Sequence, residues 1–220
     1  MTIPSKYTNH YMPVKYFLAS YRALSDGRSG IRHLEEQVDR SATLLTEWRV
    51  NWIGSCTLLR TAIDLFRVDA KSCLSQRLRE EIAIEWKLIS ERKADHQIFW
   101  EFLRRERDNI IHDYNWRAYE AWMKPDGTFG ATSLSLLSLG EDQARRVILM
   151  KSGHFKGRNS LELLNESADW VETRIFGAIR RAGYNPEEER GLFHFQPKPT
   201  LADSILRNEI PTLISSAIAD

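Results

Sequence analysis

The chain has 220 residues, of which 42% are hydrophobic and 28% charged, an ordinary composition for a globular protein of one domain. Its formal net charge of +1 excludes a global attraction to polyanions, so a nucleic-acid site would have to come from local clustering. No apolar run reaches the roughly 18 residues of a membrane span, and residues 1–11 are polar, unlike a secretory signal. We therefore expect a cytoplasmic protein with no membrane contact. Cys56 and Cys73 lack the spacing of a zinc motif, and we expect neither a metal nor a cofactor.

The first third of the chain is predicted to be helical. A short helix runs from Tyr16 to Leu24 and stops near Asp26-Gly27, because glycine often ends a helix. A second helical segment begins at Gly30 and reaches Val38. From Ser41 to Ala70 apolar residues recur every three or four positions without a proline, which predicts one long helix that bends at Gly54.

Helical periodicity continues to the middle of the chain. Ser75 is placed to cap a helix over residues 76–93. A further apolar run over residues 98–103 leads into a basic stretch. Either Asp95 caps it as a separate helix, or the two runs form one bent helix. Four tryptophans are spaced for helix packing and are assigned to the core or to a dimer face: Trp48, Trp52, Trp86 and Trp100.

The pattern changes after Tyr114. Residues 124–127, Lys-Pro-Asp-Gly, predict a turn. Residues 128–139 and 145–150 predict a β-hairpin that packs on the helices. Asn159 is expected to cap a last long helix, which ends at Gly183.

These elements predict a mainly α fold, a helical bundle with a small β-hairpin insertion. The bundle would occupy residues 1–183, with the insertion at about 120–158. Residues 184–220 would form a C-terminal tail that carries a short helix.

The chemistry of the sequence is concentrated between Arg104 and Tyr114, where four bases, two acids and an amide surround an Ile-Ile pair. His112 can transfer a proton near neutral pH, and Arg107 can bind a phosphate through two hydrogen bonds. This combination suits phosphodiester chemistry. RNA supplies its own nucleophile, the 2′-hydroxyl, so such a site requires no metal. Nearby arginines would hold the flanking phosphates: Arg104, Arg105 and Arg117.

Arg107 and His112 are five residues apart and therefore lie about 140° apart around an ideal helix. A two-fold dimer would let both residues of each chain line one cleft between the subunits. Asp108 is four residues before His112, on the same helical face, and is a candidate for orienting the imidazole.

The run from Arg107 to His112, Arg-Asp-Asn-Ile-Ile-His, resembles the signature of the HEPN superfamily, Arg-polar-x3-His in a helical bundle. The resemblance implies a metal-independent endoribonuclease that acts as a homodimer, as a toxin or a component of antiphage defence. Tyr114 extends the pattern to Arg-x4-His-x-Tyr, which is similar to HEPN toxins paired with a minimal nucleotidyltransferase antitoxin. In those proteins the tyrosine is adenylylated, which would make Tyr114 the modification site here.

Two further interpretations remain open. Arg107 and Asp108 could be a surface ion pair and His112 a boundary residue, or the domain could be a HEPN-like module that binds RNA or a protein without cleaving. The loop of residues 151–158 is basic and precedes a helix. Lys156 and Arg158 could form the rim of an RNA site, although a plain surface loop is the alternative.

Overall fold

The computed structural model describes residues 11–38, 45–73, 75–114, 117–123, 128–130 and 145–191. The chain divides into two units, one of residues Met12–Glu189 and one of the two terminal segments. The first unit is mainly helical, which confirms the predicted fold class at that level. Among the described residues none of the helices combines the length and the apolarity needed to cross a bilayer.

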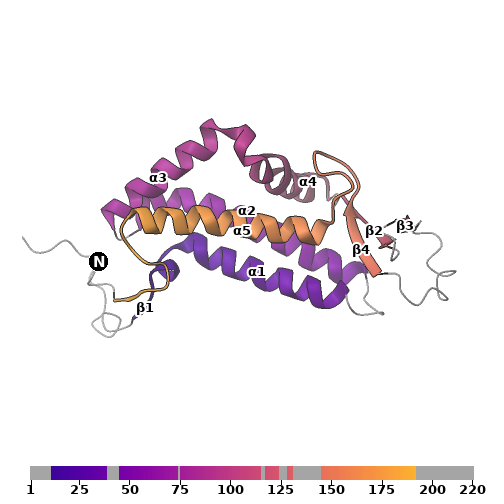
Figure 1. Ribbon diagram of the computed structural model, residues 1–220, viewed down its shortest axis with the longest axis horizontal. Coiled ribbons are helices and arrows are strands. Elements are labelled where there is room, and N and C mark those ends of the chain that lie inside the picture. The colour runs from indigo at the N-terminus through magenta and orange to yellow at the C-terminus, as the bar shows by residue number, and fades with distance from the viewer. Residues whose placement is uncertain are drawn as a thin grey trace, which may run out of the picture. The chain divides into compact units, whose positions relative to one another are not determined.

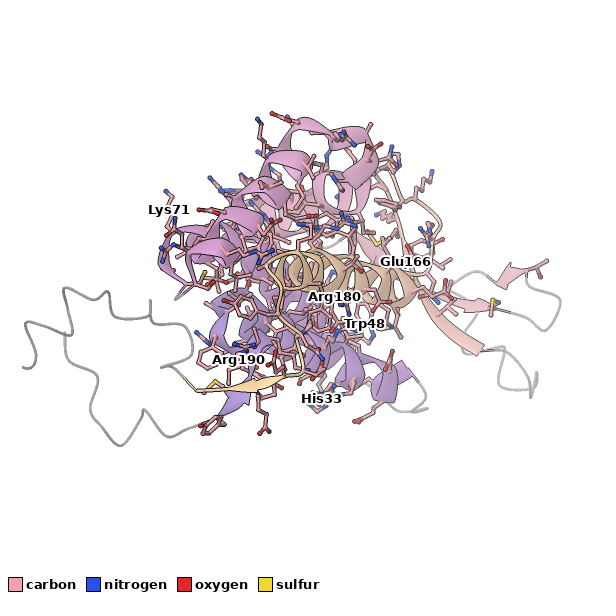
Figure 2. All side chains as sticks on the ribbon, turned by 60° about the vertical axis from the view of Figure 1, so that its left-hand side comes forward. His33, Trp48, Lys71, Glu166, Arg180 and Arg190 are labelled. Atoms are coloured by element: carbon pink, nitrogen blue, oxygen red, sulfur yellow. The ribbon has the colours of Figure 1, made fainter. Side chains whose placement is uncertain are left out.

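Three long helices lie side by side in this unit: α1 (Ala19–Val38), α2 (Leu45–Ser72) and α5 (Ser160–Arg181) (Figure 1). Helix α3 (Gln76–Glu91) packs on both α2 and α5. The interior holds large apolar side chains, among them Trp48, which lies within the bundle in Figure 2, while Lys71 lies at the surface. The two-residue strands β1 (Met12–Pro13) and β5 (Glu189–Arg190) stand near the ends of the unit, and a 3₁₀ helix, η2 (Val14–Phe17), follows β1.

Helix α1 is continuous, so the predicted break at Asp26-Gly27 is wrong. The glycines serve packing instead of termination. A Cβ atom at Gly30 would stand 2.4 Å from Ser55 Oγ, and one at Gly27 would stand 3.1 Å from Leu59 Cδ2. The missing side chains therefore let α1 approach α2 closely.

The start of α1 is fixed by a carboxylate from α2. Asp69 is buried, and its oxygens accept hydrogen bonds from the backbone N–H groups of Ala19 (3.2 Å) and Ser20 (3.0 Å) and from Ser20 Oγ (2.6 Å). The carboxylate thus caps free donors at the first turn, although it is 50 residues away from Ala19 in sequence.

The long helix predicted over 41–70 is confirmed as α2 for the described residues, and its predicted first turn, 41–44, lies outside them. Its apolar stripe is buried throughout, as is typical of a central helix. Ser75 caps α3 as predicted, because its Oγ accepts a hydrogen bond from the N–H of Leu78 at 3.3 Å. On α3, the buried Glu85 carboxylate pairs with Arg174 (3.0 Å) and Arg181 of α5 and so joins the two helices.

The segment between α3 and the basic stretch is not one regular helix. A 3₁₀ helix, η3 (Lys93–His96), leads into a π-helix, η4 (Ile98–Leu103), and then into α4 (Arg104–Asp113). The predicted cap at Asp95 is wrong, because Asp95 lies inside η3 and the first turn has no side-chain cap. The π turn was not predicted. Its ladder shows in the N–H of Arg104, which donates to the carbonyl of Phe99.

The small sheet has the strand order β3 (Phe129–Gly130), β2 (Ala118–Met123), β4 (Arg145–Met150), and its strands are antiparallel. The strand at 145–150 is confirmed, but its predicted pairing with 128–139 is wrong, since β4 pairs with β2 from Ala118↔Met150 to Met123↔Arg145. Of the predicted partner segment only residues 128–130 are described, and Phe129–Gly130 pairs with the other edge of β2. The predicted turn at 124–127 lies outside the described residues.

Helix α5 begins and ends as predicted. The side chain of Asn159 accepts a hydrogen bond from the N–H of Leu161 at 2.9 Å and donates to Glu162 at 3.3 Å. At the other end Gly183 has a φ of +85°, the left-handed conformation that favours glycine. Of the predicted tail only residues 184–191 are described, so its short helix lies outside them.

The different roles of the glycines in α1 and α2 give a testable pair of substitutions. Gly54 lies inside α2 with no atom within 4 Å of a Cβ built on it, so Gly54→Ala should raise the free energy of unfolding by about 1 kcal/mol. Gly30→Leu should lower it by about 2 kcal/mol, because the new side chain would meet Ser55. Urea denaturation of both variants checks the opposite signs. A stabilised Gly30→Leu protein would contradict the close approach of α1 and α2.

Candidate functional site

Helix α4 displays the basic stretch on one side and anchors itself with the other. Glu106 and Ile110 are buried. The side chains that face outward span an arc of about 160° at 100° per residue. They are, in order around the helix, Arg107, Ile111, Arg104, Asp108, His112 and Arg105, and each is partly or largely exposed.

Asp108 is the centre of the charges on this face. Its carboxylate accepts from Arg107 Nη1 at 3.0 Å, and its second oxygen lies 3.8 Å from Arg104 Nε. Arg60 of α2 is close to this pair and forms its own ion pair with Asp64 at 2.8 Å. Burial lowers the pKa of the Arg60 guanidinium and Arg104 and Arg107 lower it further, while Asp64 and Asp108 oppose the shift. The crowded guanidinium groups thus leave a positive field that only two carboxylates offset.

His112 is exposed near the end of α4, and within the described part of the chain its ring has no hydrogen-bond partner. The Asp108 carboxylate, expected to orient the imidazole, is engaged by the two arginines instead. Ile111 lies between Arg107 and His112 around the helix and is 51% exposed. An apolar side chain in the middle of a polar face is suited to contact with another surface.

Tyr114 ends α4 in the left-handed conformation, with a φ of +47°. Among the described residues it is the only residue other than glycine with a positive φ, and its N–H donates to the carbonyl of Asn109. The residue is 71% exposed, and the guanidinium of Arg49 lies 5.6 Å from its ring centroid. The phenol is therefore presented to solvent at a backbone conformation that costs free energy for a residue with a Cβ atom.

Glu106 and Arg117 form a buried ion pair behind the basic face. Arg117 donates to Glu106 Oε1 from Nε (2.8 Å) and Nη2 (2.6 Å), and Glu106 is fully buried. Burial raises the pKa of the Glu106 carboxyl, and Arg117 opposes that rise. The side chain of Arg117 is only 16% exposed, so this predicted phosphate contact has little surface to offer a ligand.

The loop of residues 151–158 packs against the helices before α4. Phe155 is edge-on to Phe102, with ring centroids 6.2 Å apart. Arg158 pairs with Glu166 on α5, while Lys156 is exposed. The two predicted contacts of the rim are therefore in different situations, because only Lys156 extends into solvent without an ion pair among the described residues.

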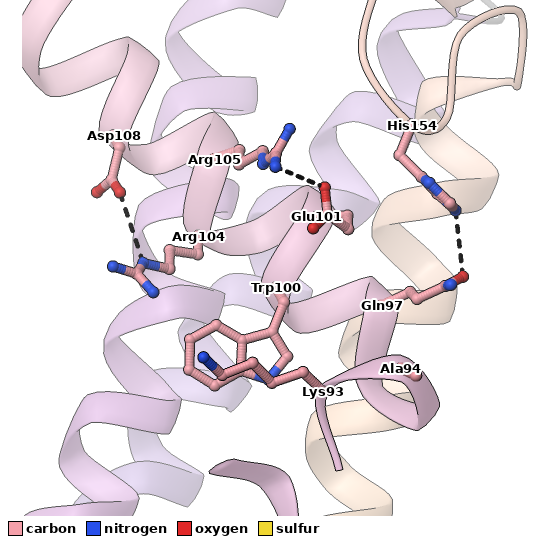
Figure 3. Close-up of a pocket in the computed structure, with 9 residues that line it drawn as sticks. All are labelled: Lys93, Ala94, Gln97, Trp100, Glu101, Arg104, Arg105, Asp108 and His154. Carbon is pink, nitrogen blue, oxygen red and sulfur yellow. Dashed lines mark hydrogen bonds and ion pairs between the residues drawn. The ribbon is translucent and has the colours of Figure 1, made fainter. Parts of the chain in front are cut away.

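A pocket of about 490 Å³ opens beside the basic face (Figure 3). It is lined by residues of η3, η4, α4 and the 151–158 loop, and it shares Arg104, Arg105 and Asp108 with the predicted site. The sequence gave no pointer to its other members, because they are far apart in the chain or were assigned to the core. The spacing of Trp100 and Arg104, four residues apart on one helical face, was the available signal. The remaining lining residues are Lys93, Ala94, Gln97, Trp100, Glu101 and His154.

Within the residues that the structure describes, no group of His, Cys, Asp and Glu side chains is arranged to hold a metal ion. No protein-family model matches the sequence, and neither a curated protein nor a solved structure is significantly similar to the chain.

The buried pair predicts a stability that depends on pH. Because burial raises the pKa of Glu106 above its ordinary 4.5, protonation favours the folded state, and that contribution is lost as the pH rises through the folded pKa. Arg117→Met removes the cation that opposes the shift, so the variant should lose about 3 kcal/mol of unfolding free energy at neutral pH. The deficit should shrink toward a pH of about 5, as Glu106 takes up a proton.

Denaturant unfolding across this pH range is the measurement, with the double variant Glu106→Gln/Arg117→Met as the control. The double variant carries no buried charge, so it should regain stability at neutral pH and lose the extra pH dependence. An Arg117→Met deficit that does not change with pH would contradict the ion pair as its cause.

Proposed function

We propose that the protein is a metal-independent endoribonuclease of the HEPN type, acting as a homodimer in a toxin or antiphage-defence system. The observation that carries the proposal is the outward face of α4, where Arg107 and His112 are both accessible and further arginines surround them. Arginine and histidine at one site match the needs of RNA cleavage by internal attack.

In the proposed reaction His112 accepts the proton of the RNA 2′-hydroxyl. The 2′-oxygen attacks the adjacent phosphorus, the bond from phosphorus to the 5′-oxygen breaks, and the leaving oxygen takes up a proton. The products are a 2′,3′-cyclic phosphate and a 5′-hydroxyl. Arg107 stabilises the charge that develops on the phosphoryl oxygens. The phosphate would replace Asp108 as the anionic partner of Arg107, a favourable exchange in a field crowded with guanidinium groups.

The dimer follows from the geometry of one helix. Arg107 and His112 diverge by about 140° around α4, so a single chain aims them at different points. A second copy related by a two-fold axis would supply the complementary residue to each site, and the exposed Ile111 between them would be covered in that contact.

A domain that binds RNA or a protein without cleaving is the second candidate. The feature that favours it is the ion pair between Arg107 and Asp108, which occupies the guanidinium proposed to stabilise the phosphate. In this alternative the arginines of α4 bind phosphates and His112 has no chemical role.

The first test is cleavage of total RNA and tRNA by the purified protein in EDTA. We expect the wild type to cleave and His112→Ala and Arg107→Ala each to lose at least about a hundredfold in rate, since each removes a group that acts in the transition state. The cleavage products should carry a 2′,3′-cyclic phosphate. Arg32→Ala and His33→Ala are matched controls, since both residues are exposed on α1.

The outcomes separate the two candidates. Cleavage that both α4 variants retain would exclude this site. RNA binding by the wild type without cleavage, in a protein shown by its intact mass to be unmodified, would favour the binding module.

The resemblance also proposes Tyr114 as the target of a nucleotidyltransferase antitoxin, and its 71% exposure makes the phenol accessible. Incubation with such an enzyme and ATP should add one nucleotide to the wild type and silence cleavage. Tyr114→Phe should gain no mass, because it lacks the acceptor oxygen. Tyr119→Phe is the matched control, since Tyr119 is also exposed, at 39%. Loss of the added mass in both variants, or in neither, would contradict Tyr114 as the acceptor.

A further inference from the structure

The pocket beside α4 combines an aromatic ring with cations and hydrogen-bonding groups. Trp100 is held in place by a hydrogen bond from its Nε1 to the carbonyl of Ile89, at 3.0 Å. The ammonium of Lys93 lies 4.8 Å from the indole centroid and the guanidinium of Arg104 lies 5.3 Å from it. Among the described residues Lys93 has no carboxylate partner, so its charge is available to an anion.

The opposite side of the pocket is polar and comes from a different part of the chain. His154 Nε2 lies 3.1 Å from Gln97 Oε1, which joins the 151–158 loop to the turn before η4. Figure 3 shows Gln97 and His154 on one side and Arg104 with Asp108 on the other, with Trp100 and Lys93 between them. An amide and an imidazole are groups that hydrogen-bond to the edge of a base or to a ribose hydroxyl.

The charges connect this pocket to the proposed active site. Arg105 is paired with Glu101 at 3.0 Å, whereas Asp108 is shared between Arg104 of the pocket and Arg107 of the motif. Three fixed cations line the pocket against two carboxylates, before the histidine is counted. A ligand anion at Lys93 and Arg104 would therefore be adjacent to the phosphate that Arg107 is proposed to bind.

We propose that this pocket binds one nucleotide of a single-stranded RNA next to the scissile position, with its phosphate at Lys93 and Arg104 and its base against Trp100. Its volume of about 490 Å³ lies in the range of ligand pockets, roughly 300–1,000 Å³. Stacking on an aromatic ring inside a cationic groove is how proteins hold single strands. The identity of the ligand as RNA rests on the proposed function, whereas the binding of a nucleotide does not. Lys93, Gln97, Trp100 and His154 are thereby positioning residues that select the cleavage site.

The test measures binding and cleavage separately, using the full chain. A fluorescein-labelled, single-stranded 2′-O-methyl RNA lacks the attacking hydroxyl, so fluorescence anisotropy in EDTA reports binding alone. Lys93→Glu should weaken binding about tenfold, because it reverses one phosphate contact. Lys87→Glu is the matched control: it makes the same charge change on α3, where Lys87 is 73% exposed and pairs with Glu91, and it should weaken binding less than about twofold. Equal loss in the two variants would overturn the pocket, since net charge alone would then account for it.

A second arm distinguishes RNA from a free nucleotide. Adenosine monophosphate and inorganic phosphate are titrated into the complex as competitors. Weak displacement by the nucleotide, lost in Lys93→Glu, is expected for a subsite of RNA. Tight binding of the nucleotide at this pocket without displacement of the RNA would overturn the assignment to RNA.

The cleavage assay makes the failure of this proposal distinguishable from failure of the proposed function. If the enzyme cleaves RNA, Lys93→Glu and Gln97→Ala should raise KM and shift the preferred cleavage positions, with kcat within about threefold of wild type. A large loss of kcat with unchanged KM would overturn the positioning role. If His112→Ala shows that α4 is not catalytic, the anisotropy difference between Lys93→Glu and Lys87→Glu still decides whether the pocket holds a nucleotide.

Discussion

The ion pair between Glu106 and Arg117 determines how the other parts of the site are arranged. A carboxylate buried in the protein interior requires a cation, and that cation is supplied by a residue beyond the end of α4. To reach back, the chain must reverse, and the left-handed Tyr114 lies in the reversal. The 151–158 loop also meets this point, because the N–H of Lys151 donates to the carbonyl of Arg117 at 2.7 Å and a Cβ at Gly153 would stand 2.7 Å from Arg117 Nη1. One desolvated charge thus ties α4, β2 and the loop together and leaves the opposite face of α4 toward solvent.

That outward face is a set of charges close to balance, with an excess of guanidinium groups. Asp108 holds two of them apart from solvent ions, and Arg60 adds a third from α2. In such a cluster an incoming phosphate meets donors that are already positioned, so little side-chain entropy is lost on binding. The same arrangement is compatible with binding alone, which is why the chemistry of His112 is the deciding matter.

The parts of the fold set by local sequence were predictable, and those set by distant contacts were not. The periodic apolar residues of α2 and α5 and the caps at Ser75 and Asn159 act within one helical turn. Gly27 gave the opposite indication, because its reason for being small is a side chain of α2 that the local pattern does not contain. The strand at 145–150 was recognisable, but its partner depends on long-range pairing across residues 124–144. For the site, the motif on α4 was visible, whereas the pocket required η3, η4 and the loop to converge.

The π-helix before α4 has a consequence for how this chain can vary in length. An i→i+5 turn contains one residue more than an i→i+4 turn. Expelling a single residue between Ile98 and Leu103 would convert the segment to a regular helix and rotate everything after it by about 100°. Glu106 would then leave the interior, and the arginine after it would move toward the core. Substitutions in this segment alter its packing, but a one-residue insertion or deletion alters its phase, so sequences that share this site should vary here in composition and not in length.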